Sequence, residues 1–167
     1  VEEKPTLTLG ADGILYQTEG DGVTKKALSL VPIKIAPKTP YQLERLAGSI
    51  FLKTGDNLFL FDEETAAFGA FYSPVKDLVL SPDGRKVMYY SDYDVFYYVA
   101  NPNAIDISLS QIGKIPLAAS ATEIVSAYWL NNDYVIFSDN SNLVISEIDP
   151  RGNINTVSIP QISEAFF

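Results

Sequence analysis

Aspartates that recur at short polar turns are the residues whose type and spacing could do chemistry. They fall between an apolar run ending in Thr or Ser and a second apolar run. Carboxylate oxygens on successive turns could bind Ca²⁺ or a basic protein surface. Asp also favours turns through local hydrogen bonds, which is the competing interpretation. The candidate binding residues are Asp21, Asp56, Asp92, Asp94 and Asp139, with Tyr93 as an aromatic side chain at a turn tip.

Composition excludes much of the remaining chemistry. The chain of 167 residues has no His and no Cys, so an imidazole base, a thiol nucleophile and a zinc or iron–sulfur site are excluded. Its 12 Lys and Arg against 21 Asp and Glu give a net charge of −9, which argues against nucleic-acid binding. We therefore predict no catalytic residues and no resident cofactor or metal, with Ca²⁺ at the acidic turns as the alternative.

Two further kinds of site need neither His nor Cys. A glycosidase needs two carboxyl groups about 5 to 10 Å apart in a cleft, and glutamates are available for such a pair. The Tyr-rich segment from Tyr89 to Tyr98, and Tyr128 with Trp129, could stack on a sugar or peptide, although such side chains also fill β-sheet cores. The glutamates in question are Glu44, Glu63, Glu64, Glu123, Glu147 and Glu164.

The elements that must position these residues come from an internal repeat. The apolar runs end at Thr18, Thr54, Ser91 and Ser138, so the spacings are 36, 37 and 47 residues. Two β-branched or aromatic runs around a short Gly, Asp or Asn turn are typical of a β-hairpin. A period near 40 residues with strand-like content favours propeller blades, in which each blade is a four-stranded sheet.

A strand that precedes each hairpin extends the repeat. Leu7–Leu9 and Leu78–Leu80 are followed by the related turns Gly10–Gly13 and Ser81–Gly84. We predict a single all-β, antiparallel domain: a β-propeller or partial propeller of about four four-stranded blades. A two-sheet β-sandwich is the alternative fold. The expected blade-sized units are residues 6–40, 41–74, 75–121 and 122–160, with Ala118–Ala121 as a small-residue linker.

One unit carries a family resemblance. The segment Leu80-Ser-Pro-Asp-Gly-Arg-Lys-Val87, followed by Ser91-Asp92 and the run Val95–Val99, resembles the repeat of TolB-type β-propellers. The match covers about residues 75–100, and the fourth unit is similar to propeller repeats of bacterial surface proteins. The resemblance implies a WD-like propeller that makes protein contacts at a cell envelope. It implies no catalytic residue.

These observations favour a non-catalytic protein-interaction or scaffold module of an extracytoplasmic or cell-surface protein. The alternative function is a carboxylate-based glycan hydrolase or a glycan-binding propeller. The expected partner is another protein or the remainder of a larger propeller, with a homo-oligomer as a further form. We expect no nucleic-acid partner, and no apolar run is long enough to span a membrane.

Overall fold

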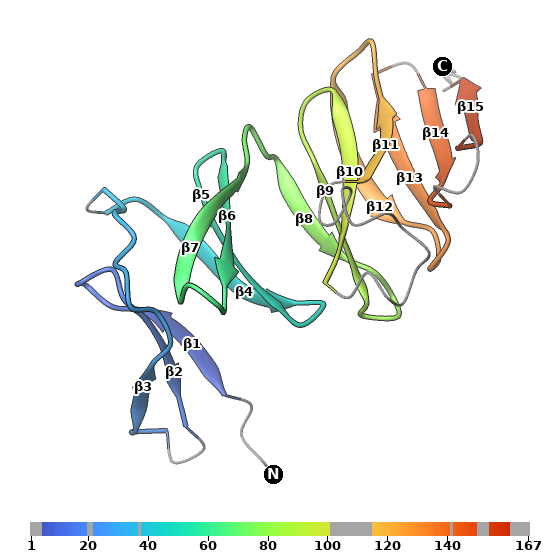
Figure 1. Cartoon of the computed structure of the whole chain (residues 1–167). Coiled ribbons are helices and arrows are strands. Elements are labelled where there is room, and N and C mark those ends of the chain that lie inside the picture. Colours follow the sequence, from blue (N-terminus) through green and yellow to red (C-terminus); the bar gives the residue numbers. More distant parts are fainter. Residues whose placement is uncertain are drawn as a thin grey trace, which may run out of the picture. The chain divides into compact units, whose positions relative to one another are not determined.

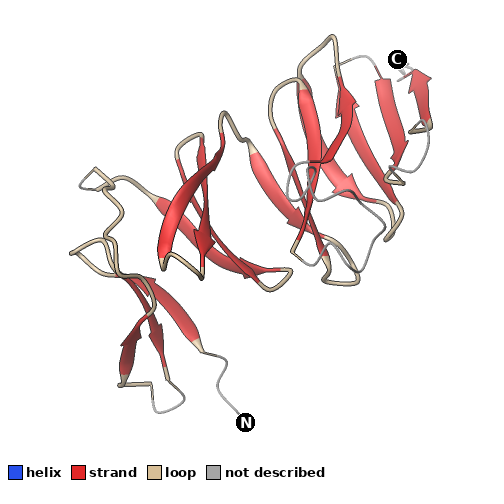
Figure 2. Ribbon diagram, in the orientation of Figure 1, coloured by secondary structure: helices blue, strands red, loops and turns tan. Residues whose placement is uncertain are grey.

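The computed structural model describes residues 5–19, 22–36, 38–100, 115–140, 142–149 and 154–160. These residues form strands, turns and loops, and none of them belongs to a helix that could cross a membrane (Figure 2). The chain divides into two compact units, which are described separately. Unit 1 comprises Val1–Arg45 and Ser49–Pro74, and unit 2 comprises Leu46–Gly48 and Val75–Phe167.

Four antiparallel sheets account for all the described strands (Figure 1). Sheet A contains β1 (Thr6–Leu9), β2 (Leu15–Thr18) and β3 (Lys25–Ala27); sheet B contains β4 (Tyr41–Leu46), β5 (Ser49–Thr54), β6 (Asn57–Asp62) and β7 (Ala67–Tyr72). Sheet C contains β8 (Asp77–Leu80), β9 (Lys86–Tyr90), β10 (Asp94–Val99) and β11 (Ile115–Ala119); sheet D contains β12 (Ile124–Trp129), β13 (Tyr134–Asp139), β14 (Asn142–Glu147) and β15 (Thr156–Pro160).

The predicted fold class is confirmed. Each sheet is a meander in which sequential strands are neighbours, as in a propeller blade, and there are four sheets rather than the two of a sandwich. The described part of sheet A has three strands where four were expected. Strand β11 includes Ala118 and Ala119, which the sequence assigned to a linker, because both pair with the start of β10.

The turns Gly10–Gly13 and Ser81–Gly84, which the sequence predicted to be related, have the same backbone hydrogen bond. The Gly13 amide donates to the Gly10 carbonyl at 2.9 Å, and the Gly84 amide donates to the Ser81 carbonyl at the same distance. Both glycines have positive φ, 78° and 70°. At Gly13 a Cβ atom would also lie 2.4 Å from the Ile33 carbonyl oxygen, so glycine is required there twice over.

Unit 1 has a small core between sheets A and B. Leu15 of β2, Ile50 of β5 and Phe61 of β6 are buried together. After β3 the chain returns toward sheet B, where the Leu30 amide donates to the Ala66 carbonyl at 2.8 Å. Partly buried side chains complete this cluster: Leu7, Leu28, Leu43, Ala66 and Phe68.

Unit 2 has the larger core, which joins sheets C and D. Alternate residues of β9 and β10 face alternate residues of β12 and β13, as expected for two sheets packed face to face. Tyr97 is fully buried there, and its hydroxyl donates to the Ile148 carbonyl at 3.0 Å. Burial raises the pKa of Tyr97 to about 12. The buried members are Met88, Tyr90, Val95, Tyr97, Val99, Leu117, Ile124, Ala127, Val135, Phe137 and Ile148.

Candidate functional site

The connection between sheets C and D, residues 120–123, gathers several of the sequence-predicted residues. The Ser120 amide donates to the Tyr93 carbonyl at 2.7 Å, and the Ile124 amide donates to the Asp92 carbonyl at 2.6 Å. The Ser120 hydroxyl donates to Oδ2 of Asp139 at 3.2 Å. This connection therefore holds the β9–β10 turn and the end of β13 at the same end of unit 2.

Among the predicted aspartates that the structure describes, Asp139 is the most buried, with 7% of its surface exposed. Its Oδ1 accepts hydrogen bonds from the amide of Asn142 at 2.6 Å and from Nδ2 of the same residue at 3.4 Å. A carboxylate that accepts backbone and side-chain donors across a turn stabilises that turn. Asp139 thus orders the β13–β14 turn while its other oxygen engages Ser120.

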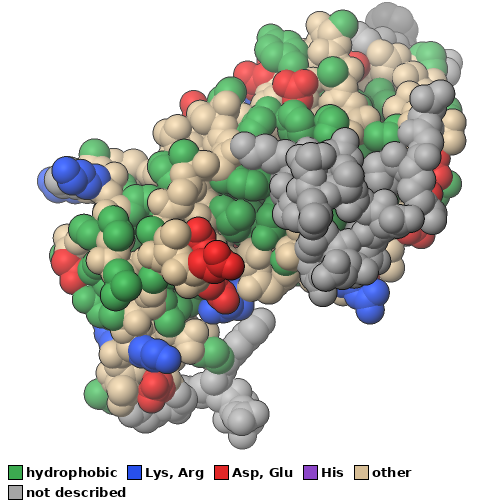
Figure 3. Space-filling model, in the orientation of Figure 1, with side chains coloured by type: hydrophobic (Ala, Val, Ile, Leu, Met, Phe, Trp, Pro, Cys, Tyr) green, Lys and Arg blue, Asp and Glu red, His purple; other side chains and the backbone are tan. Residues whose placement is uncertain are grey.

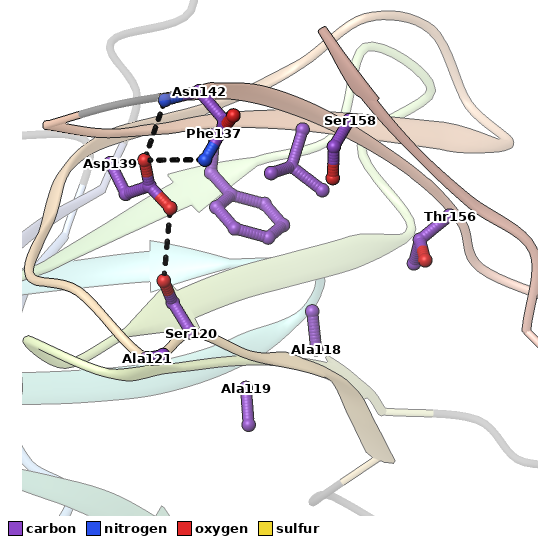
Figure 4. Close-up of a pocket in the computed structure, with 10 residues that line it drawn as sticks. Ala118, Ala119, Ser120, Ala121, Phe137, Asp139, Asn142, Thr156 and Ser158 are labelled. Atoms are coloured by element: carbon purple, nitrogen blue, oxygen red, sulfur yellow. Dashed lines mark hydrogen bonds between the residues drawn. The ribbon is translucent and has the colours of Figure 1, made fainter. Parts of the chain in front are cut away.

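A pocket of about 320 Å³ lies beside Asp139, between β11 of sheet C and the last three strands of sheet D. Figure 4 shows Asp139 bonded to Ser120 and Asn142 at one end, with Ser158 and Thr156 further along the pocket. Its described lining residues are Ala118, Ala119, Ser120, Ala121, Phe137, Asp139, Asn142, Val144, Thr156 and Ser158.

The small side chains of β11 explain the pocket. Packed sheets lie ~10 Å apart, and facing side chains normally fill that space. Ala118, which faces sheet D, is too short to do so, whereas the next strand inward carries Val95, Tyr97 and Val99, which are buried. Among the described lining residues Asp139 is the only ionisable one. The pocket therefore offers hydroxyl, amide and carboxylate groups beside apolar walls.

A second polar cluster lies on the other side of the same connection. Nζ of Lys76 is 2.8 Å from Asp92, 2.7 Å from Glu123 and 2.8 Å from the Ile124 carbonyl oxygen. Hydrogen bonds to Asp92 and Glu123 raise the pKa of Lys76 above its ordinary value. Asp92 is therefore neutralised by a lysine of its own unit.

The other predicted site residues are placed as follows. Asp56 lies in the exposed β5–β6 turn of unit 1. Tyr93 lies at the tip of the β9–β10 turn with 54% of its surface exposed, and Asp94 begins β10, where its amide donates to the Ser91 hydroxyl. Asp21 lies outside the described residues. Within the described parts of the chain, no group of three acidic side chains is arranged to hold a metal ion.

The sequence did not single out Ser120, Asn142, Thr156 or Ser158 as site residues. One signal was present, because the run Ala118–Ala121 contains only small residues between two sheets of large ones. The contributions of β14 and β15 depend on which strand positions face sheet C. A one-residue change of register would have turned those side chains to the opposite face.

Sheet D also has a second, outer face that points away from sheet C. The register places Tyr128, Ile136, Ile145 and Val157 opposite one another in a row across the four strands. Alternate residues in these strands pack in the core between the sheets, so this row lies on the other face. Tyr128 is 60% exposed and Val157 is 59% exposed. A neighbouring position, Ile159, is 46% exposed.

Comparison with known proteins finds no protein family that matches the chain and no curated protein with significant similarity to it.

Proposed function

We propose that this chain is a non-catalytic protein-interaction module whose binding surface is the outer face of sheet D. The supporting observation is the apolar row of Tyr128, Ile136, Ile145 and Val157, whose two ends are more than half exposed. Contiguous apolar surface of this kind is typical of protein contact sites. On the side of the molecule that Figure 3 presents, hydrophobic side chains lie at the surface among both acidic and basic groups.

The occupant we propose is a β-sheet of a second copy of this chain. The inner face of sheet D presents Ala127, Phe137 and Val144, and it is covered by sheet C. The outer face carries the same types of side chain at alternate positions, so it suits the same kind of cover. The chain's own sheets are therefore the natural complement.

The area of this face sets the expected affinity. Four strands of five or six residues cover roughly 350 Å². A stable interface buries about 800 Å² per partner, so this contact alone supports weak, concentration-dependent association. Two copies of net charge −9 also repel each other, and salt screens that repulsion. Self-association should therefore strengthen as the salt concentration rises.

Sedimentation velocity on the intact chain from ~10 µM to ~1 mM tests the proposal. We expect a larger mean sedimentation coefficient at high concentration, and a stronger effect between ~0.05 and ~0.5 M NaCl. The variant Val157→Lys should abolish it. The matched control is Leu30→Lys, which makes the same kind of change at an 81% exposed residue of unit 1 and should leave association unchanged. A monomer at every concentration, or equal loss in both variants, would refute the proposal.

A TolB-type propeller repeat remains our proposed family for these sheets. It is supported by the hydrogen-bonded Ser81–Gly84 turn at the position that the repeat predicts. The alternative of a glycan hydrolase has less support, because catalysis needs two carboxyl groups in one cleft and the described lining of the pocket contains one.

A further inference from the structure

We propose that the pocket between β11 and the outer strands of sheet D binds a neutral, polyhydroxylated small molecule of about the size of one sugar ring. The pocket lies on the inner side of sheet D, whereas the proposed protein-binding surface is the outer face of that sheet. The two proposals therefore concern different surfaces, and each can fail without the other.

The size of the pocket limits the ligand. Its volume is about 320 Å³, at the lower end of the ~300–1,000 Å³ that small-molecule sites span. A peptide segment or a nucleotide would need more room than this, whereas a single pyranose or cyclitol ring would not. Thr156 and Ser158 are both exposed, so the pocket is open to solvent at β15 and a ligand can enter there.

The charge of the described lining favours a neutral ligand. No Lys or Arg is among the described lining residues, so a phosphate or carboxylate group would find no counter-charge on any of them. The one carboxylate, Asp139, already accepts hydrogen bonds from Ser120 and Asn142, so it is not a free partner for a cation. A ligand hydroxyl would share the Asp139 carboxylate with the donors already bonded to it, since each carboxylate oxygen can accept more than one hydrogen bond.

The described lining combines hydroxyl groups on β15 with apolar side chains on β13 and β14. Across the inner face of sheet D, Ser158 pairs with Val144, and Thr156 pairs with Ser146. The inner positions of β13, Val135 and Phe137, are buried and apolar. Hydroxyl side chains on β15, an apolar wall from Phe137 and Val144, and the Asp139 acceptor match a ring that has hydroxyls at its edge and C–H groups on its face.

An amide-resolved NMR titration of the intact chain tests this assignment. The probes are methyl glucoside, methyl galactoside, N-acetylglucosamine and myo-inositol, with glucose 6-phosphate as the anionic control and glucosamine as the cationic control. At least one neutral probe should cause saturable shifts at Ser120, Asp139 and Asn142. Linear or absent shifts with every neutral probe would overturn the proposal, as would tighter binding of either charged control.

Variants locate the binding. Ala118→Leu should fill the pocket, and the pair Thr156→Val and Ser158→Val should remove two hydroxyls from an exposed edge strand at little cost in folding. Each should weaken binding by at least ~10-fold. The control Ala70→Leu makes the same enlargement on the exposed part of β7 in unit 1 and should leave binding unchanged. Unaltered binding in the pocket variants would overturn the proposal.

Val157→Lys separates the two proposals. It changes the outer face of sheet D, so it should abolish self-association and leave sugar binding intact. Loss of sugar binding in this variant, with the fold retained by circular dichroism, would place the ligand on the outer face and overturn the pocket assignment.

Discussion

The two related turns are Gly10–Gly13 in sheet A and Ser81–Gly84 in sheet C. They have the same backbone hydrogen bond, but their aspartate side chains have different partners. Oδ1 of Asp12 accepts the Ile14 amide at 3.0 Å, and Oδ1 of Asp83 accepts the Arg85 amide at the same distance. The second oxygen of Asp12 accepts the Tyr16 hydroxyl at 2.7 Å, an exposed contact within its own hairpin. The first turn therefore stabilises mainly itself.

Asp83 belongs to a network that ties sheet C to sheet D. Its Oδ2 lies 3.0 Å from Nζ of Lys86, whose side chain is 8% exposed and lies 5.9 Å from the Trp129 ring of sheet D. The Asp83 amide donates to Asn132 Oδ1 at 2.9 Å, and Trp129 Nε1 donates to the Val79 carbonyl at 2.8 Å. The same local motif is thus a hairpin turn in one place and an inter-sheet connection in the other.

The largest expected effect comes from breaking that network. Asp83→Ala leaves the buried Lys86 ammonium without its carboxylate and should destabilise unit 2 by about 2–3 kcal/mol. Trp129 is the only tryptophan of the chain and lies in unit 2, so urea unfolding followed by its fluorescence reports on that unit. Asp12→Ala, followed by circular dichroism, should cause a smaller loss. Equal losses of stability in Asp83→Ala and Asp12→Ala would mean that the ion pair with Lys86 adds no stability to unit 2.

The Ser81–Gly84 turn should also make the stability of unit 2 depend on pH. Partial burial of Asp83 opposes its ionisation, but hydrogen bonds from Ser81, Arg85 and Lys86 outweigh it and lower the pKa from 3.8 to about 2. A lowered native pKa stabilises the fold above pH 3.8, and this contribution is lost as the pH falls toward 2. With solvent screening, we expect a loss of about 1–2 kcal/mol.

The measurement is the urea midpoint of unit 2 at a series of pH values, in the wild type and in Asp83→Asn. The variant keeps the shape of the side chain but has no proton to gain in this range. The difference between the two stability curves should therefore shrink between pH 3.8 and about 2. A constant difference would show that the Asp83 charge contributes no stability.

Trp129→Phe tests the sheet D side of the connection. The change removes the indole hydrogen bond to the Val79 carbonyl and weakens the contact with Lys86, while the aromatic ring remains. We expect a loss of about 1 kcal/mol in a thermal melt followed by circular dichroism. The neighbouring Tyr128→Phe is the control, since Tyr128 is 60% exposed on the outer face. A comparable loss of stability in Tyr128→Phe would mean that the contacts of Trp129 with Val79 and Lys86 are not what stabilises unit 2.

The alternation of short apolar runs with polar turns made much of this fold predictable, because strand formation depends on local residue types. Strands β1 and β8 contain the predicted segments Leu7–Leu9 and Leu78–Leu80. The motif Ser81–Gly84 also predicted its own turn. Its connection to Trp129 was not predictable, because that contact joins residues far apart in the sequence and depends on how two sheets pack.

The candidate site was predictable only in part, for the same reason. Asp139 was identified from its turn, but its partner Ser120 comes from another sheet and Ser158 from the edge strand of its own sheet. The sequence placed Asp92 among the acidic turns that could bind Ca²⁺ or a basic protein surface, and the structure pairs it with Lys76. Residues that form turns can be predicted from the local sequence, whereas the side chains that neutralise their charges depend on tertiary packing.

The smallest expected effect comes from replacing Lys76, a second lysine of unit 2. Comparing it with Lys86 tests whether burial distinguishes the Ser81–Gly84 network from a surface ion pair. Lys76 has 32% of its side chain exposed, and its partners Asp92 and Glu123 are 47% and 55% exposed. Water and salt screen such pairs, so Lys76→Met should cost about 0.5 kcal/mol at low salt and less in ~0.5 M NaCl. Lys86→Met, which removes the buried ammonium that pairs with Asp83, should cost more and change little with salt. If the two variants lost equal stability with equal salt dependence, burial would not be what distinguishes the Ser81–Gly84 network from an ordinary surface ion pair.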